Sequence, residues 1–132
     1  MPLPRVFIIG HNKSGTRSIC KLFNDNSYTS LHWDSNRIAN SIRRNFYLSQ
    51  SLLSGIKDAN VYSDMESIMG DSSIEAHPFY AYRLFPLLDL QYPNSLFIYN
   101  YRDKNEWIRS RINHLSGRYF EACRMHLKSL HR

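Results

Sequence analysis

The sequence lacks an apolar stretch long enough to cross a membrane, because polar or charged residues interrupt every window of 19 residues. We also expect no secretory signal, since residues 1–5 lead straight into an apolar run. The only two cysteines, Cys20 and Cys123, fall in expected helices and lack metal-ligand spacing. We expect both to be reduced packing residues, which favours a cytoplasmic protein.

Repeats, linkers and low-complexity segments are also missing, and glycine and proline number only five each. A chain of 132 residues with 42% apolar and 14% aromatic content predicts one folded domain over residues 1–132. The 17 basic residues outnumber the 11 acidic ones, giving a formal charge of +6, which attracts anions. They are spread along the chain rather than gathered in a stripe, so nucleic acid is not an expected partner.

Short apolar runs alternate with helical patterns along the chain. Strands are expected at 6–9, 28–33, 59–63 and 95–101. Helices are expected at 16–23, 36–54, 78–90, 104–115 and after Gly117, with a loop at 70–73. We expect Asp34 or Ser35 to cap the second helix, Pro86 to break or kink the third, and the fourth strand to be buried on both faces. The alternation predicts an α/β three-layer fold, with a parallel sheet of about four strands flanked by helices.

A glycine-punctuated turn follows the first strand. Gly10 and Gly15 allow the backbone to fold tightly, so that its N–H groups converge on an anion at the positive end of the next helix. Lys13 supplies a mobile positive charge, and Thr16 and Ser18 supply hydroxyl donors. We interpret this loop as a site for the 5′ end of a phosphorylated nucleotide.

The loop differs from a standard nucleoside-triphosphate site. The pattern G-x-x-x-x-G-K-[ST] needs a lysine directly after the second glycine and then a hydroxyl that holds magnesium. Here Thr16 and Arg17 follow Gly15, and the lysine is Lys13. This order favours a donor with one phosphate at this position and no obligatory metal. The core from Lys13 to Thr16 resembles the 5′-phosphosulfate loop of sulfotransferases, which use 3′-phosphoadenosine 5′-phosphosulfate (PAPS). The alternative is a chance Ser-Gly-Thr turn.

A second motif follows the fourth strand. Arg102 stands at the carboxyl end of that strand, where open α/β sheets bind ligands, and Ser110 lies about two turns into the next helix. An arginine fork and a hydroxyl could hold a second phosphate, and this spacing resembles the 3′-phosphate site of sulfotransferases. Alternatively, Arg102 and Asp103 form a surface ion pair that caps the helix, and Ser110 faces solvent or the sheet.

The wider run 92–110 resembles the "YPxxKFILxxRDPxxWxxS" stretch of a small P-loop sulfotransferase family. That family also tends to carry a His-Trp pair after its first helix, as at His32 and Trp33, and an aspartate after its third strand, as at Asp64. The likeness covers roughly residues 5 to 116, and the usual C-terminal segment is not expected in this chain. The second threonine of the family's loop is replaced by Arg17 here. The resemblance implies that the donor is bound by Asn12, Lys13, Ser14, Gly15, Thr16, Arg17, Ser18, Arg102 and Ser110.

Sulfuryl transfer also needs a base at a strand end near the loop, while Lys13 stabilises the charge of the leaving group. We favour Asp64, because the carboxyl end of the third strand should adjoin the loop. A carboxylate in this role needs partial burial to raise its pKa toward a useful value. His32 is second, because its ordinary pKa is already suitable. Asp34 and Glu66 are further candidates, and His11 lies within the loop. Each has a structural alternative, as a helix cap or a core histidine.

The expected function is therefore transfer of sulfate from PAPS, without a metal, to a hydroxyl or amine of a carbohydrate or small metabolite. Partners are the nucleotide, an unidentified acceptor and, through an exposed apolar flank, a second copy of the chain. The first alternative is a nucleotide kinase or triphosphatase with an altered loop, for which Asp103 is a weak magnesium candidate. The second is a module that binds a bisphosphonucleotide without turnover. Four aromatic residues could line the acceptor pocket or belong to the core, namely Phe79, Tyr80, Tyr82 and Phe85.

Overall fold

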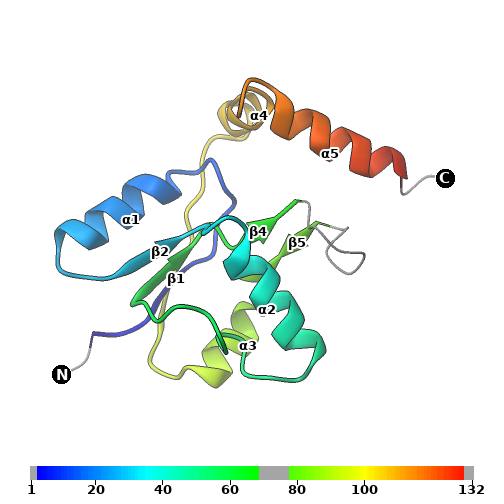
Figure 1. Ribbon diagram of the computed structural model, residues 1–132. Coiled ribbons are helices and arrows are strands. Elements are labelled where there is room, and N and C mark those ends of the chain that lie inside the picture. Colours follow the sequence, from blue (N-terminus) through cyan, green and yellow to red (C-terminus); the bar gives the residue numbers. More distant parts are fainter. Residues whose placement is uncertain (1–2, 69–77, 130–132) are drawn as a thin grey trace.

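A computed structural model describes residues 3–68 and 78–129, so the loop expected at 70–73 lies outside the described residues. Four parallel strands form one sheet in the order β2-β3-β1-β6 (Figure 1). Their bounds are β1 Val6–Ile8, β2 Ser30–His32, β3 Val61–Ser63 and β6 Leu96–Ile98. A small antiparallel pair joins β4 (Glu66–Ser67) to β5 (Phe79–Tyr80). The α/β prediction with a four-stranded parallel sheet is confirmed.

Helices cover both faces of the sheet. They are α1 (Thr16–Asp25), α2 (Arg37–Tyr47), α3 (Phe85–Gln91), α4 (Lys104–Ile112) and α5 (Arg118–Ser129), with a 3-10 turn η1 at Ala81–Leu84. Phe7 of β1 packs in the larger cluster with Ile42 of α2 and Leu88 of α3. Val6 and Ile8 point to the opposite face and pack against side chains of α1. Because alternate residues of a strand face opposite sides, a strand covered on both faces is apolar throughout.

The fourth expected strand is not buried on both faces, and that prediction is wrong. β6 lies at the edge of the sheet and pairs only with β1 in the described part of the chain. Leu96 pairs with Val6, so both side chains project from the same face, yet Leu96 is 55% exposed and Val6 is 1% exposed. On this face Ile98 still packs against the cluster beside α1, whereas Leu96, at the start of β6, is left uncovered.

The expected second helix is shorter than predicted, because it ends at Tyr47 instead of reaching residue 54. Asn45, buried in its last turn, donates from Nδ2 to the carbonyl oxygens of Leu52 and Ser54 at 2.9 and 2.8 Å. These bonds hold the following segment in a separate turn. The helix begins after Asn36, which has a φ of 65°, and no side chain of the described ranges caps it. The prediction of a cap at Asp34 or Ser35 is therefore wrong.

The third expected helix is three elements in the structure, namely β5, η1 and α3. Pro86 lies in the first turn of α3, so it begins a helix rather than breaking one. Proline suits this position because the first helical N–H groups have no partner within the helix.

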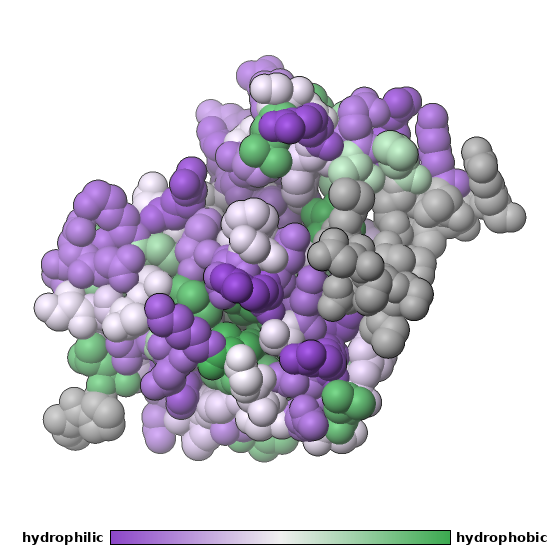
Figure 2. Space-filling view, in the orientation of Figure 1, coloured by the Kyte–Doolittle hydropathy of each residue, from purple (hydrophilic) through white to green (hydrophobic). Residues whose placement is uncertain are grey.

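The carboxyl ends of the strands meet at one edge of the sheet, and α4 and α5 lie above this edge, with α5 over β4 and β5 (Figure 1). The surface over α1 is mainly hydrophilic in this view, with apolar side chains in small separate patches (Figure 2). None of the helices in the described ranges is both long and apolar enough to span a membrane.

Candidate active site

The loop after β1 is fixed by an asparagine that sequence reasoning missed. Asn100, buried just after β6, accepts a hydrogen bond at Oδ1 from the N–H of Gly10 at 2.9 Å. Its Nδ2 donates to the carbonyl oxygen of Ser14 at 3.0 Å. A Cβ at residue 10 would lie only 2.0 Å from the carbonyl oxygen of Asn100, so no other residue fits there without displacing the backbone. The one sequence signal for Asn100 is its place at a strand end, two residues before Arg102.

The backbone of this loop offers N–H groups to an anion. Within the described residues, no N–H group of residues 11–15 donates to a backbone carbonyl. Lys13 and Gly15 have left-handed backbones, with φ of 62° and 85°, and α1 begins directly at Thr16. Left-handed residues and a helix N-terminus turn successive N–H groups toward one point, which is how proteins bind phosphate.

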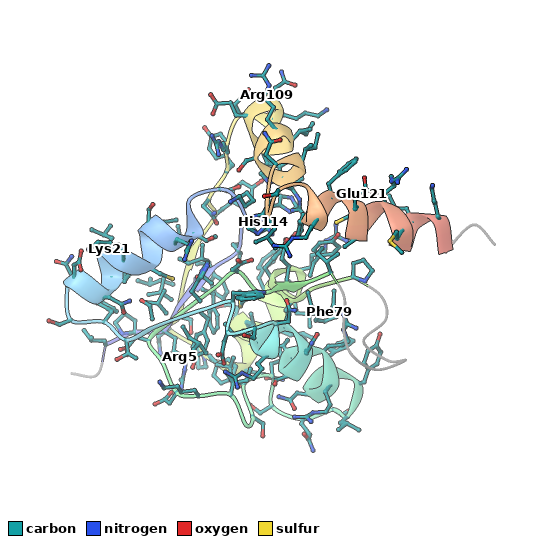
Figure 3. The ribbon with its side chains drawn as sticks, turned by 45° about the horizontal axis from the view of Figure 1, so that its top comes forward. Arg5, Lys21, Phe79, Arg109, His114 and Glu121 are labelled. Atoms are coloured by element: carbon teal, nitrogen blue, oxygen red, sulfur yellow. The ribbon has the colours of Figure 1, made fainter. Side chains whose placement is uncertain are left out.

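Positive side chains surround the same loop. His114, at the junction of α4 and α5, has a lowered pKa, first because of burial and then because of Lys13, Arg111 and Arg17 nearby. His114 follows the C-terminal end of α4, whereas Arg109, in the last turn of this helix, lies on its exposed side (Figure 3). The end of α4 therefore completes a cluster of cations that begins in the loop.

Asn12 connects the loop to the two C-terminal helices. Its carbonyl oxygen accepts from Nε1 of Trp107 in α4 at 2.9 Å, and its Nδ2 donates to the hydroxyl of Tyr119 in α5 at 3.3 Å. The side chain is 7% exposed, and its Oδ1 has no hydrogen-bond partner among the residues that the structure describes. The structure thus places the predicted ligand Asn12 beneath α4 and α5, while the other predicted loop residues lie on the loop and the start of α1.

Glu66 is buried and paired with its neighbours, which makes it a poor candidate for the base. Its side chain is 3% exposed, and Oε1 accepts from the hydroxyl of Tyr119 at 3.0 Å and lies 3.3 Å from Nη2 of Arg111. The guanidinium of Arg111 also bonds the Tyr119 hydroxyl. Burial raises the pKa of Tyr119, so its hydroxyl stays a donor at neutral pH. This buried pair anchors α4 and α5 to β4.

The two favoured base candidates lie next to each other. Nε2 of His32, at the end of β2, is 3.6 Å from Oδ2 of Asp64, which follows β3. Nδ1 of His32 is 2.9 Å from Oγ of Ser63, and the same oxygen is 2.8 Å from Sγ of Cys20. Asp64 is a non-glycine residue with a φ of 52°. Strained backbones of this kind cost roughly 1–3 kcal/mol and concentrate at functional sites.

The pKa values of this pair are shifted in opposite directions. Burial raises the pKa of Asp64 to about 7, and Glu66 adds to the effect, while Arg111 and Lys13 oppose it. Burial, followed by the charge of Arg17, lowers the pKa of His32 from 6.5. Near neutral pH the imidazole of His32 is therefore neutral, while the carboxyl group of Asp64 changes between its protonated and its ionised form. An acid with a pKa near the working pH is suited to proton transfer.

The remaining candidates lie outside this centre or have other partners. Asp34 forms an ion pair of 2.6 Å with Arg37, and the ring of His11 is bonded to the hydroxyl of Tyr82 at 2.7 Å. Asp103 caps α4, because its Oδ1 accepts from the N–H groups of residues 105 and 106 at 3.0 Å each. The carboxylate that was a weak candidate for binding magnesium therefore already accepts two backbone hydrogen bonds. In the described part of the chain, no group of three or more His, Cys, Asp or Glu side chains could hold a metal ion.

The second predicted phosphate site lies beyond β6. Arg102 is ion-paired through Nε with Oε2 of Glu106 at 3.2 Å, rather than with Asp103 as the alternative interpretation held. Its side chain is 42% exposed, and Ser110 is half-buried on α4. β6 neighbours β1 in the sheet, so both motifs follow adjacent strands.

A parallel sheet with a glycine-punctuated loop after β1 and a buried acid after β3 has its polar groups at the carboxyl ends of the strands, where α/β proteins bind their ligands. The family model described as "Sulfotransferase domain" matches residues 5–132. The chain therefore belongs to the sulfotransferase domain family, as the motifs of the sequence predicted. A comparison with curated proteins gave no significant match. Membership of this family supports sulfotransferase activity in general, and the family generally uses PAPS.

Proposed function

We propose that this protein transfers a sulfuryl group from PAPS to a hydroxyl or amine acceptor. The observation that carries the proposal is the placement of Lys13 and Asp64 after the adjacent strands β1 and β3. The charge of Lys13 also acts on the pKa of Asp64, so the two side chains are within electrostatic range of each other. A cation for the leaving group and a base for the acceptor are the two charged groups that this reaction needs.

The 10–15 loop fits the 5′-phosphate of the donor. Its N–H groups, those at the start of α1 and the side chain of Lys13 would bind the phosphate oxygens. Thr16 and Ser18 would add hydroxyls, and Arg17 would add a guanidinium to the same charge cluster. Because these groups are backbone amides and positively charged side chains, they stabilise charge on the departing phosphate oxygen without a metal ion.

Arg102 and Ser110 would bind the 3′-phosphate. The present partner of Arg102 is an exposed i,i+4 glutamate, and surface pairs of this kind contribute only about 0–1 kcal/mol. A phosphate can therefore replace Glu106 at small cost and accept two parallel hydrogen bonds from the guanidinium.

In the transfer step, the acceptor oxygen or nitrogen forms a bond to sulfur as the bond from sulfur to the bridging phosphate oxygen breaks. Asp64 accepts the acceptor's proton, and Lys13 stabilises the negative charge that remains on the departing oxygen. Ser63 holds His32 against Asp64 from the other side. If the Cys20 thiol donates to Ser63, the serine hydroxyl donates to Nδ1, and the imidazole carries its proton on Nε2, facing Asp64.

Titration with 3′-phosphoadenosine 5′-phosphate, AMP and ATP, each with and without magnesium, tests the donor assignment by calorimetry. We expect the bisphosphate to bind more tightly than AMP and without magnesium. Transfer is then measured with labelled PAPS and a panel of hydroxyl and amine acceptors. Magnesium-dependent binding of ATP in preference to the bisphosphate would instead indicate a kinase or triphosphatase. Tight binding of the bisphosphate with no transfer to any acceptor would indicate a binding module.

A further inference from the structure

A pocket of about 330 Å³ lies between α4, α5 and the β5–η1 segment, directly beside the loop. It lies near the lower end of the usual range for small-molecule sites, which is about 300–1,000 Å³. Its volume therefore suits a compound with one or two rings. The residues that matter for its specificity are His11, Tyr80, Arg83, Trp107, Phe120 and Cys123.

The walls of this pocket are mainly apolar and aromatic. Trp107, Ile108 and Ile112 come from α4, and Phe120 comes from α5. The ring of His11 lies against that of Trp107, with centroids 5.1 Å apart. Flat apolar walls favour a ring, because aromatic pairs gain about 0.5–1.5 kcal/mol beyond their buried area.

The polar groups of the walls are largely occupied within the protein. Arg111 and Tyr119 are bonded to Glu66, and His11 is bonded to Tyr82. A sugar would need many free donors and acceptors, because each buried hydroxyl without a partner costs about 1–3 kcal/mol. The pocket is therefore poorly suited to a carbohydrate.

Arg83 adds a charge to this apolar site. Its guanidinium lies 4.9 Å from the centre of the Tyr80 ring, and no carboxylate pairs with it among the residues that the structure describes. By contrast, the other arginine of the pocket, Arg111, is neutralised by Glu66. A cation beside an aromatic wall favours a ligand that carries a negative charge on a ring.

The pocket also shares wall residues with the contacts that hold the loop and β4 against α4 and α5. His11 lines it and stands two residues before Lys13 in the same loop. Arg111 lines it as well and pairs with Glu66 of β4, which stands two residues after Asp64. A compound in the pocket can therefore direct a hydroxyl toward the end of β3.

We infer that this pocket binds the acceptor, and that the acceptor is a small aromatic hydroxyl compound with an anionic group, such as a hydroxyphenyl carboxylate. The inference rests on the proposed sulfuryl transfer and narrows its acceptor. Arg83 binds the anionic group, Trp107 and Phe120 pack on the ring, and the hydroxyl faces Asp64. The phenol oxygen forms the new bond to sulfur and passes its proton to Asp64.

The intrinsic fluorescence of Trp107 measures binding without requiring transfer. The only other tryptophan is Trp33, which is 45% exposed, so the Trp33→Phe protein has a single reporter. We expect 4-hydroxyphenylacetate to change its fluorescence and bind most tightly, 4-methylphenol to bind more weakly, and tyramine and glucose to bind least. Equal affinity for the acid and for tyramine, or preferential binding of glucose, would overturn the inference.

Two substitutions added to the Trp33→Phe protein test the role of Arg83. Arg83→Gln should weaken binding of 4-hydroxyphenylacetate about fivefold, the effect of roughly 1 kcal/mol, and leave that of 4-methylphenol unchanged. Arg83→Lys should retain the preference for the acid. Arg109→Gln removes the same charge from the exposed side of α4 and should change neither affinity (Figure 3). An unchanged affinity for the acid in the Arg83→Gln protein would refute the assignment.

Cys123 provides an independent measurement, because its side chain lines the pocket whereas Cys20 is 5% exposed. 4-Hydroxyphenylacetate should slow alkylation of Cys123 by iodoacetamide, and Cys123→Ser should abolish the protected labelling. Unchanged labelling at a saturating concentration of the acid would place it elsewhere and overturn the inference. Binding and protection without transfer from PAPS would retain the pocket and reject the proposed function. Transfer of sulfate from PAPS to glucose, with no protection of Cys123 by the acid, would retain the proposed function and reject the pocket assignment.

Discussion

Nε2 of His32 lies 3.6 Å from Oδ2 of Asp64, at the carboxyl ends of the neighbouring strands β2 and β3. Sequence reasoning treats these residues as alternatives for one base, whereas the structure pairs them. Ser63, which is fully buried, bonds the far side of the imidazole and so fixes the ring against the acid. Two titrating groups this close influence each other's protonation, so the apparent pKa values seen in a pH profile describe the pair and not either residue alone.

The rate of transfer should rise with pH through about 7, because burial raises the pKa of Asp64 to about 7 and only its ionised form accepts a proton. Asp64→Asn should lower kcat by about 10²–10⁴-fold, the usual contribution of a general base. The check is a profile of kcat/KM against pH for the parent and the variant. A variant with the parent's rate and profile would show that the base lies elsewhere.

The same carboxyl group should make stability fall as the pH rises. The pKa of Asp64 is about 7 in the folded state and 3.8 ordinarily, so the folded state holds the proton more tightly. Its contribution is complete below about pH 4 and is lost by pH 8, and roughly 4 kcal/mol is an upper bound for it. Urea unfolding of the parent and of Asp64→Asn between pH 5 and 8 measures this.

The difference in free energy of unfolding between the parent and Asp64→Asn reports on Asp64 separately from the other titrating groups. The lowered pKa of His32 acts with the opposite sign, since it removes stability as the pH falls below 6.5. As the pH rises from 5 to 8, the free energy of unfolding of the parent should fall relative to that of Asp64→Asn. A constant difference between the two proteins would contradict the raised pKa.

Lys13→Ala should lower the transfer rate by about 100-fold or more, because a fixed cation would no longer stabilise the leaving oxygen. Lys21→Ala is the matched control, since Lys21 is on α1 and pairs with the exposed Asp25 at the surface. Circular dichroism should show both variants folded, and the control should keep the parent's rate. Equal losses in the two variants would indicate a general effect of charge.

Arg102→Ala should weaken binding of 3′-phosphoadenosine 5′-phosphate about tenfold or more and leave AMP almost unaffected, because only the bisphosphate reaches this site. Arg109→Ala, on the outer side of the same helix, removes an equal charge (Figure 3). Calorimetric titrations give the ratio of the two affinities for each protein. If this ratio were the same in Arg102→Ala as in the parent, the 3′-phosphate assignment would be wrong.

Gly10→Ala should destabilise the protein by several kcal/mol or prevent folding, because its Cβ would meet the backbone of Asn100 at 2.0 Å. Gly55→Ala is the control. Its Cβ would meet no atom of the described neighbours within 4 Å. The expected cost is therefore only the backbone strain of an alanine at a φ of 73°, about 1–2 kcal/mol. Thermal unfolding measures both. A Gly10→Ala protein no less stable than the control would show that the loop can shift away from β6.

The sequence predicted the parallel sheet, the loop and the order of the motifs, because these depend on local patterns. Apolar runs, glycine turns and helical spacing are written within a few residues of each other, as at Val6 to Gly15. It could not predict that β6 is an edge strand, because a run such as Leu96 to Ile98 is equally apolar whether or not a neighbour covers it.

Local patterns alone thus determined which side chains follow each strand. Only the tertiary structure decided their partners: His32 with Asp64, Asn100 with the loop, and Glu66 with Arg111 and Tyr119. These contacts join residues far apart in the chain, so they depend on the strand order and on where α4 and α5 rest. The burial that raises the pKa of Asp64 arises in the same way, because it comes from the packing of several elements around one carboxyl group.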